Sequence, residues 1–192
     1  MAADCAERGY AGATVEGVLA QTGISRATFE RHFDDKADCA LAAVDQILAE
    51  TTRTVANAQL PDLTDWQRLL NATHALLELM AARPSYARLA CVEARQSMSS
   101  EAYERYAAGI RVLIAMLDQA RAYASAGAPA SATYGAIGSA EFLIKRELIA
   151  GRAEHLPQLL PDIIYGTVVP FVDQQEALWY AELAREMVND GR

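Results

Sequence analysis

Apolar residues recur at spacings of three and four along most of the chain, and this periodicity limits the possible folds more than any other feature. Residues with such spacing lie on one face of an α-helix. The alternation that marks a β-strand comes near only in residues 163–172, where the neighbouring Pro161 and Pro170 disfavour a strand. Alanine, a strong helix former, is abundant. The chain is therefore predicted to be all-α.

Start and stop signals divide the chain into helices of ordinary length. Serine, threonine and aspartate at helix starts accept orphan backbone N–H groups, whereas glycine and proline mark helix ends. The expected helices span about residues 3–8, 14–22, 25–33, 35–60, 64–83, 85–96, 99–127, 131–150, 156–172 and 174–188.

The bulk composition indicates an ordinary globular protein of one or two domains. The 192 residues are 52 % hydrophobic and 22 % charged, and no run of 18 uncharged apolar residues predicts a membrane span. The N-terminus lacks the pattern of a signal peptide. Three scattered cysteines, Cys5, Cys39 and Cys91, favour neither a disulfide framework nor a zinc site. A cytoplasmic protein without a cofactor is expected.

The first 35 residues contain the layout of a helix-turn-helix. Thr14 is placed to cap one short helix, Gly23 supplies the turn after it, and Ser25 caps the next helix. Phe29 and Phe33, four residues apart, share one face and are expected to lie in the core rather than stack on bases. The apolar residues of the preceding helix complete that core: Val15, Val18 and Leu19.

Two later helices are apolar on more than one side. These are the expected helices over residues 131–150 and 156–172, the eighth and ninth in order. A helix of this kind must bury a second surface, either in an unusually apolar core of its own chain or against another molecule.

Enzyme motifs are missing from the sequence. It contains no phosphate-binding G-x-x-x-x-G-K-[ST], no zinc-binding H-E-x-x-H and no G-x-S-x-G. The three histidines, His32, His74 and His155, lie far apart and lack a partner at ligand spacing. A non-enzymatic protein without a metal is therefore expected.

The string GYAGATVEGVLAQTGISRATFERHFDDKADC, residues 9–39, resembles the TetR family of bacterial one-component transcriptional regulators. The resemblance implies a helix-turn-helix DNA-binding domain over residues 1–35, with a first helix shorter than the family's. It implies a helical effector-binding and dimerisation domain over residues 36–192. It also implies a homodimer, joined through the eighth and ninth helices, that sets two recognition helices about one DNA turn apart on a pseudo-palindrome.

The same resemblance assigns roles in DNA binding to residues of this sequence. Arg26 is the expected reader of a guanine edge, and Thr28 combines a thymine methyl contact with a phosphate contact. The backbone-binding positions are Thr14, Ser25, His32 and Lys36, and Arg31 can serve either purpose. The complete expected DNA-binding set is Thr14, Ser25, Arg26, Ala27, Thr28, Glu30, Arg31, His32 and Lys36.

Glu30 departs from the family, which most often has a phosphate-binding tyrosine at this position. A carboxylate cannot donate to a phosphate, but it can accept from a cytosine amino group or pair with Arg26. Residues 1–50 also carry nine acidic side chains against four basic ones. Two hypotheses therefore stand: a repressor in which Glu30 orders Arg26 or reads a base, and a related helical ligand-binding protein with weak or lost DNA binding.

The effector of such a repressor is expected to be a small hydrophobic molecule with one or two polar anchors, bound among the fourth to eighth helices. Polar groups within apolar stripes are the candidates for those anchors, although His74, Tyr103 and Tyr106 also fit an interior role. The expected ligand-binding residues are His74, Leu77, Met80, Gln96, Tyr103, Tyr106, Ile110, Met116 and Glu141.

Overall fold

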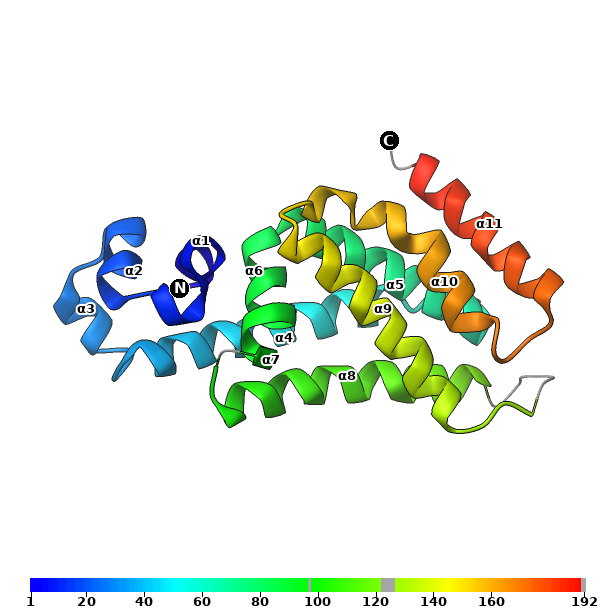
Figure 1. Cartoon of the computed structure of the whole chain (residues 1–192), viewed down its shortest axis with the longest axis horizontal. Helices are drawn as coiled ribbons and strands as arrows, with labels where there is room; N and C mark the ends of the chain where they lie inside the picture. Colours follow the sequence, from blue (N-terminus) through cyan, green and yellow to red (C-terminus); the bar gives the residue numbers. More distant parts are fainter. Residues whose placement is uncertain (97, 122–126, 191–192) are drawn as a thin grey trace.

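The computed structural model describes residues 1–96, 98–121 and 127–190, and within these ranges the chain is helical with no β-strand (Figure 1). The prediction of an all-α fold is confirmed. A small group of helices, α1 to α3, lies at one end of the molecule, and the long helix α4 runs from this group into the larger helical body (Figure 1).

The N-terminal group begins with α1 (Ala2–Gly12), which is interrupted at Gly9, and continues with α2 (Val15–Thr22) and α3 (Arg26–Glu30). The hydroxyl of Thr14 accepts from the backbone N–H of Gly17 at 3.0 Å. The hydroxyl of Ser25 accepts from that of Thr28 at 3.1 Å. Both predicted caps are confirmed, and Gly23, at a φ of 72°, ends α2 as expected.

A small apolar cluster holds this group together. Phe29, 2 % exposed, packs with Val18 and Cys39, and the rings of Phe29 and Phe33 lie 5.3 Å apart. The predicted core is confirmed. Because Cys39 belongs to the next helix, the cluster also fastens the helix-turn-helix to the body. The partly buried members of the cluster are Met1, Val15, Leu19 and Phe33.

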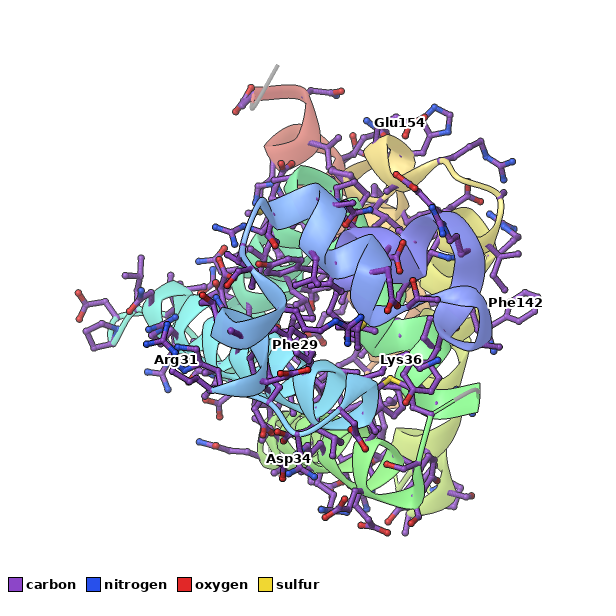
Figure 2. All side chains as sticks on the ribbon, turned by 90° about the vertical axis from the view of Figure 1, so that its left-hand side faces the viewer. Phe29, Arg31, Asp34, Lys36, Phe142 and Glu154 are labelled. Atoms are coloured by element: carbon purple, nitrogen blue, oxygen red, sulfur yellow. The ribbon has the colours of Figure 1, made fainter. Side chains whose placement is uncertain are left out.

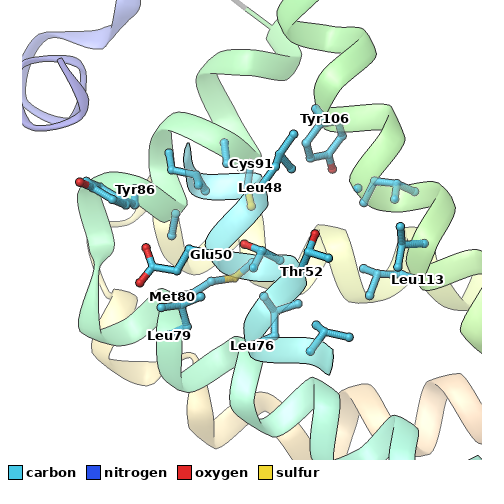
Figure 3. A pocket seen from close by; sticks show the side chains of 18 of the residues that line it. Leu48, Glu50, Thr52, Leu76, Leu79, Met80, Tyr86, Cys91, Tyr106 and Leu113 are labelled. Carbon is cyan, nitrogen blue, oxygen red and sulfur yellow. The ribbon is translucent and has the colours of Figure 1, made fainter. Parts of the chain in front are cut away.

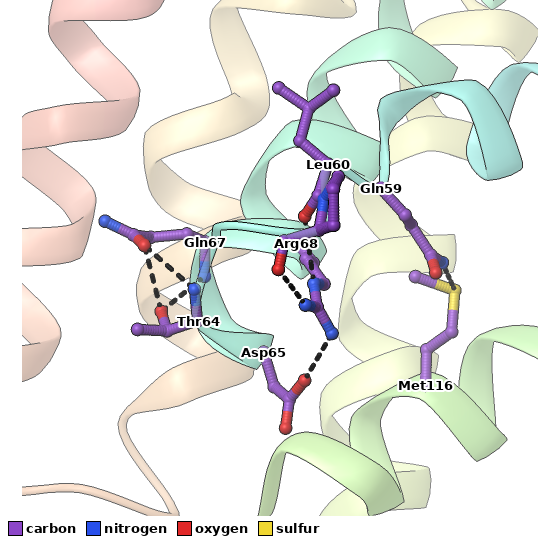
Figure 4. A network of polar contacts seen from close by, with 8 residues as sticks. Gln59, Leu60, Thr64, Asp65, Gln67, Arg68 and Met116 are labelled. Carbon is purple, nitrogen blue, oxygen red and sulfur yellow. Dashed lines mark hydrogen bonds and ion pairs between the residues drawn. The ribbon is translucent and has the colours of Figure 1, made fainter.

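The body begins with α4 (Lys36–Ala58), which the carboxylate of Asp35 caps by accepting from the backbone N–H of Asp38 at 2.9 Å. The next helix is α5 (Asp65–Ala82). Arg68 fixes the loop between these helices by donating to the carbonyl oxygens of Leu60 and Pro61 at 3.1 and 2.7 Å (Figure 4). This loop therefore has a defined shape.

The predicted helix over residues 85–96 is present but irregular. It consists of α6 (Pro84–Arg88), a π-helical turn over Leu89–Glu93 and α7 (Ala94–Gln96). The wider π turn adds a residue to the local repeat, and such turns are frequent at functional sites. The π turn packs against α1 and α4 through a shared apolar cluster that includes Cys5, Ala13, Val44 and Leu89.

The remaining helices are α8 (Ser100–Arg121), α9 (Ser131–Ile149), α10 (Leu160–Val168) and α11 (Gln174–Asp190). Short 3-10 turns over Ala153–His155 and Pro157–Leu159 join α9 to α10. The expected end of the seventh helix at Gly127 follows residues 122–126, which lie outside the described residues.

The second apolar surface expected on residues 156–172 is buried in the core of the chain itself. This segment contains α10, and its large apolar residues are buried within the chain itself, among them Ile164 at 1 % and Phe171 at 0 % exposure. The reason is that α9 and α11 pack against α10, while the ring of Trp66 on α5 stacks on that of Phe171 at 6.0 Å. Exposed large apolar side chains lie on α9 and α11 (Tyr134, Phe142, Ile149, Leu178 and Trp179), and others lie on α8 and in loops (Tyr103, Val112, Ile24 and Leu60).

The end of α9 carries an acid-sensitive contact. Glu147, 4 % exposed, accepts from Nε of Arg152 at 2.7 Å and from Nε of Arg146 at 2.8 Å. These two hydrogen bonds, led by that of Arg152, lower the pKa of the Glu147 carboxyl from 4.5 to about 2.

A depressed folded-state pKa stabilises the protein above the unfolded-state value, and the contribution disappears as pH falls through the folded-state value. We therefore expect the free energy of unfolding to fall between pH 4.5 and about 2. Chemical denaturation over this range should show a shallower pH dependence in Glu147→Gln than in the natural chain. An unchanged slope would contradict the assignment, and Glu182→Gln on the exposed surface of α11 is the matched control.

Candidate functional site

The helix-turn-helix presents a polar surface at the end of the molecule. Arg26, Ala27 and Glu30 on α3 are exposed, as are Arg31 and His32 directly after it. Figure 2 views this end and shows Arg31 projecting into solvent, while Phe29 lies beneath the ribbon. The buried ring of Phe29 therefore sets which face of α3 points outward, and the predicted DNA-binding side chains share the outward face or its margin.

Arg26 lies between two carboxylates. One belongs to Glu30, whose Oε1 is 3.8 Å from Nη1 of Arg26. The other belongs to Glu16 on α2, which accepts from Nη2 of Arg26. A hydrogen bond from the backbone at Glu16, and then the Arg26 guanidinium, lower the pKa of the Glu16 carboxyl, so it is ionised at neutral pH. The pairing proposed for Glu30 is present, whereas ten residues of separation concealed Glu16 as a partner.

Several of the other polar candidates already make hydrogen bonds within the protein. The hydroxyls of Thr14 and Ser25 serve as caps, and the Ser25 hydroxyl also lies 2.9 Å from that of Thr28. Nζ of Lys36 donates to the carbonyl oxygen of Tyr10 at 3.0 Å and lies 4.5 Å from the centre of its ring. Lys36 therefore ties α4 to α1, in addition to any contact with a phosphate.

A large apolar cavity lies inside the helical body, between α4, α5, the π turn and α8 (Figure 3). Its volume, counted to its open mouth, is about 830 Å³. Tyr106 and Leu113 enter from α8, opposite Leu76, Leu79 and Met80 on α5 (Figure 3). The space is lined mainly by hydrocarbon, as the binding sites of apolar ligands are.

Few charged groups reach this cavity. Oε2 of Glu50 on α4 pairs with Nη1 of Arg83 at 3.1 Å, and the Arg83 guanidinium lies 5.3 Å from the ring centre of Tyr86. Cys91 also lines the wall, and burial, with a smaller effect of the Glu141 carboxylate, raises the pKa of its thiol to about 12. The thiol is therefore protonated and behaves as an apolar group at neutral pH.

The structure brings only some of the predicted ligand-binding residues together. Met80, Tyr106 and Ile110 line the cavity, and Tyr103 and Glu141 line a groove beside it. Leu77 is fully buried in the core of the body, and His74 is turned toward Glu78 at 3.7 Å, so neither reaches the cavity.

Two further candidates lie elsewhere. Sδ of Met116 accepts from the amide of Gln59 at 3.4 Å near the end of α4 (Figure 4). The side chain of Gln96 lies outside the described residues. Sequence reasoning also missed the polar residues Glu50 and Arg83 in the cavity wall, because no local pattern distinguishes them from surface charges.

Neither a metal site nor a membrane-spanning helix is found in the part of the chain that the structure describes. No group of three or more histidine, cysteine, aspartate or glutamate side chains there could hold a metal ion. In the same residues, no helix has the combination of length and apolar character that a membrane crossing requires.

A helix-turn-helix followed by a long helix that lines an apolar cavity is an arrangement typical of helical one-component regulators. Comparisons with known proteins agree with this class. Residues 5–43 match the family model described as bacterial regulatory proteins, tetR family. No curated protein is similar enough in sequence to count as a match.

Three solved structures share the fold. The fatty acid degradation regulator FadR of Bacillus halodurans is 15 % identical with a TM-score of 0.74, over 88 % of this chain and 93 % of that one. A regulatory protein of the tetR family from Rhodococcus RHA1 is 20 % identical with a TM-score of 0.58, over 97 % and 92 %. The regulator FadR of Bacillus subtilis, in complex with stearoyl-CoA, is 18 % identical with a TM-score of 0.60, over 83 % and 92 %.

The resemblance seen in the sequence is thereby confirmed. Residues 5–43 match the DNA-binding region of the tetR family, and the chain as a whole shares its fold with regulators of this kind.

Proposed function

We propose that the protein is a cytoplasmic repressor that binds a pseudo-palindromic operator as a homodimer and leaves it when a small hydrophobic effector enters the cavity. Residues 1–35 would form the DNA-binding domain and residues 36–192 the effector-binding and dimerisation domain. One observation carries this proposal: the same helix, α4, reaches the helix-turn-helix at one end and lines the apolar cavity further along.

The two ends of α4 make the contacts that such a switch requires. Near its start, Cys39 packs with Phe29 of the recognition helix. About two to four turns later, Ile47, Thr51 and Val55 line the cavity. A ligand that prefers one position of α4 would therefore also change the position of α3, because a ligand shifts an equilibrium by its difference in affinity for the two states.

The fold neighbours support a hydrophobic effector. FadR of Bacillus subtilis has been solved with stearoyl-CoA, a molecule with a long apolar chain. The cavity in this chain is lined mainly by apolar side chains, as a site for such a chain would be.

We place the dimer contact on α9 and, with it, on α11. Tyr134, Phe142 and Ile149 on α9 are between 56 % and 67 % exposed, and Figure 2 shows Phe142 projecting from the edge of the molecule. Gly138, on the same face, has open space around it that lets a second helix approach closely. Only a second copy would supply the second recognition helix that a pseudo-palindrome requires.

Phe142→Glu tests this contact. Burying a phenylalanine side chain contributes about 1.5 to 3 kcal/mol, and each dimer contains two copies, so we expect the dissociation constant to rise about 100-fold or more. Analytical ultracentrifugation measures this change. Leu60→Glu, at a 53 % exposed position in the loop before α5, is the control and should leave the dimer intact. Equal dissociation of both variants, or of neither, would refute this interface.

DNA binding is tested by selecting operators from random duplex DNA and measuring affinity by gel shift. Loss of an arginine contact to guanine costs about 1 to 3 kcal/mol. Arg26→Gln should therefore lower the affinity for the selected operator about 5- to 150-fold and remove the preference for guanine at one operator position. Arg53→Gln makes the same charge change on the exposed surface of α4, about 25 Å along the helix from Lys36, and is the control. Equal effects of the two variants would contradict the role of Arg26.

The ionic strength dependence gives a second measure of the same interface. With four or five phosphate contacts per monomer, and so eight to ten in the dimer, the slope of log K against log salt should be about −7 to −9, at roughly 0.9 per contact.

A second candidate function is a TetR-like ligand-binding protein with weak or lost DNA binding. The carboxylates of Glu16 and Glu30 beside Arg26 favour it, because they oppose phosphates and occupy the guanidinium. Glu30→Tyr separates the two functions. Binding by the variant but not by the natural chain at low salt would establish the second function, whereas comparable binding by both would support the repressor.

A further inference from the structure

A groove that contains three charged side chains lies directly beside the effector cavity. It is formed by α7, α8 and α9, and its volume, counted to its open side, is about 520 Å³. Tyr106 and Ile110 line both the groove and the cavity, so the two spaces lie on either side of these residues on α8. The charged residues of the groove are Arg95, Arg111 and Glu141.

The groove carries an excess of positive charge in a chain whose net charge is −8. Nη1 of Arg95 lies 3.6 Å from Oε1 of Glu141, which offsets one positive charge. Arg111 is exposed and has no ion-pair partner among the described residues. One guanidinium is therefore left without a counter-charge in this groove.

The third charged group, Glu141, is poorly satisfied. Its Oε1 is buried and accepts no hydrogen bond within the described part of the chain. Burial raises the pKa of this carboxyl, against the opposing effects of Arg95 and Lys145. A carboxyl that protonates more readily repels an incoming anion less and can donate a hydrogen bond to it.

We propose that the effector is an amphipathic anion whose apolar chain occupies the cavity while its carboxylate or phosphate headgroup binds Arg111 and Arg95 in the groove. This inference rests on the proposed function of the cavity and adds the charge of the ligand. Guanidinium groups suit such headgroups because their N–H donors match the oxygens of carboxylates and phosphates. Tyr106 and Ile110 lie where the chain joins the headgroup.

The experiment compares three ligands that share one apolar chain: dodecanoate, dodecyl phosphate and dodecanol. Calorimetry on the full chain, below the micelle concentration of each ligand, gives the affinities. Both anions should bind the natural chain at least about tenfold more tightly than the alcohol, as expected for charge-assisted hydrogen bonds. A preference between the two anions identifies the headgroup.

Arg111→Gln should weaken both anions about tenfold and leave dodecanol unchanged, since only the headgroup contact is lost. Arg53→Gln, with the same charge change outside both spaces, should change none of the three affinities. Thr51→Phe, which fills part of the cavity, should weaken all three ligands alike. This last result would confirm that the apolar chain lies in the cavity.

Two failures are distinguishable. If dodecanol binds as tightly as both anions, and Arg111→Gln changes nothing, the headgroup site is overturned while the apolar effector cavity stands. If all three ligands bind but Thr51→Phe is without effect, the cavity is not the binding site, and the proposed function fails together with this inference.

Discussion

Replacing Phe29 with alanine is expected to unfold the helix-turn-helix while the helical body stays folded. The ring is 2 % exposed and sits in a small cluster with Val18 and Cys39, where few other apolar side chains can compensate. Removing a buried phenylalanine side chain costs about 3 to 5 kcal/mol. This loss is large for a group of three short helices, so we expect α2 and α3 to lose protection against hydrogen exchange and DNA binding to disappear.

Hydrogen exchange followed by mass spectrometry resolves this effect, because peptides from α2 and α3 can be compared with those from α10. Ile24→Ala is the matched control, since Ile24 is a large apolar residue in the turn directly before α3 but is 38 % exposed. It should change the stability by less than about 0.5 kcal/mol. If Phe29→Ala destabilised α10 as much as α3, the chain would unfold as one unit, and the helix-turn-helix would not be a separate region of stability.

Local signals predicted the helices of this chain well. Thr14, Ser25 and Asp35 cap the helices that follow them, because a cap depends on groups only three residues away. Phe29 and Phe33 share a face because helical geometry fixes the direction of side chains four residues apart. The pairing of Glu30 with Arg26 has the same local origin.

Contacts between distant segments could not be predicted in this way. The carboxylate of Asp4 is fully buried and accepts from the backbone N–H of Thr14 at 2.8 Å. A β-carbon at Gly17 would lie 2.5 Å from the same carboxylate, so glycine is required there by a contact across two helices. Nothing in the spacing of these residues indicates that the fold brings them together.

The candidate ligand site likewise contains residues that local patterns predicted and residues that only the packing of distant helices revealed. Met80 and Tyr106 were predicted because a polarizable or polar side chain stood within an apolar stripe, and Ile110 as an apolar member of the stripe that contains Tyr106; all three line the cavity. Arg83 and Arg111 resembled ordinary surface charges in the sequence. They became candidates only when the packing of α4 against α5 placed Arg83 in the cavity wall, and the packing of α8 beside α9 placed Arg111 in the groove.

Among the contacts between distant segments, that of Glu93 with Tyr10 has the largest expected consequence. Glu93 ends the π turn, whose Ala90 and Cys91 line the cavity, and the residue is 4 % exposed. Oε2 of Glu93 accepts from the backbone N–H of Tyr10 at 2.9 Å, and Oε1 lies 3.7 Å from Nη2 of Arg88.

The backbone next to Tyr10 makes this contact possible. Gly9 has a φ of 68°, which interrupts α1 so that the N–H of Tyr10 is not used within the helix and bonds to Glu93 instead. The carbonyl oxygen of Tyr10 accepts from Lys36, the first residue of α4. The segment of α1 at Tyr10 is thereby bonded both to the π turn in the cavity wall and to the start of α4, which packs against the recognition helix α3.

We expect Glu93→Ala to destabilise the protein by about 2 to 4 kcal/mol, since it leaves the part-buried N–H of Tyr10 without its acceptor and the Arg88 guanidinium without its counter-charge. Glu93→Gln keeps an acceptor for Tyr10 but removes the charge, so its cost should be smaller. Urea denaturation measures both values. Hydrogen exchange at the Tyr10 amide should accelerate in Glu93→Ala and change little in Glu93→Gln. Glu78→Ala on the exposed surface of α5 is the control and should alter neither measurement.

The functional consequence follows from linkage. The effector and the operator bind different parts of the chain, so the effector changes DNA affinity only through contacts that differ between the two states of the protein. If the bond between Glu93 and Tyr10 is one of them, Glu93→Gln will retain the affinity for the effector but reduce the factor by which the effector weakens DNA binding. If the effector still weakens DNA binding by the same factor in Glu93→Gln and Glu93→Ala, and still binds with the same affinity, the coupling passes through α4 alone. Glu93 would then only stabilise the fold.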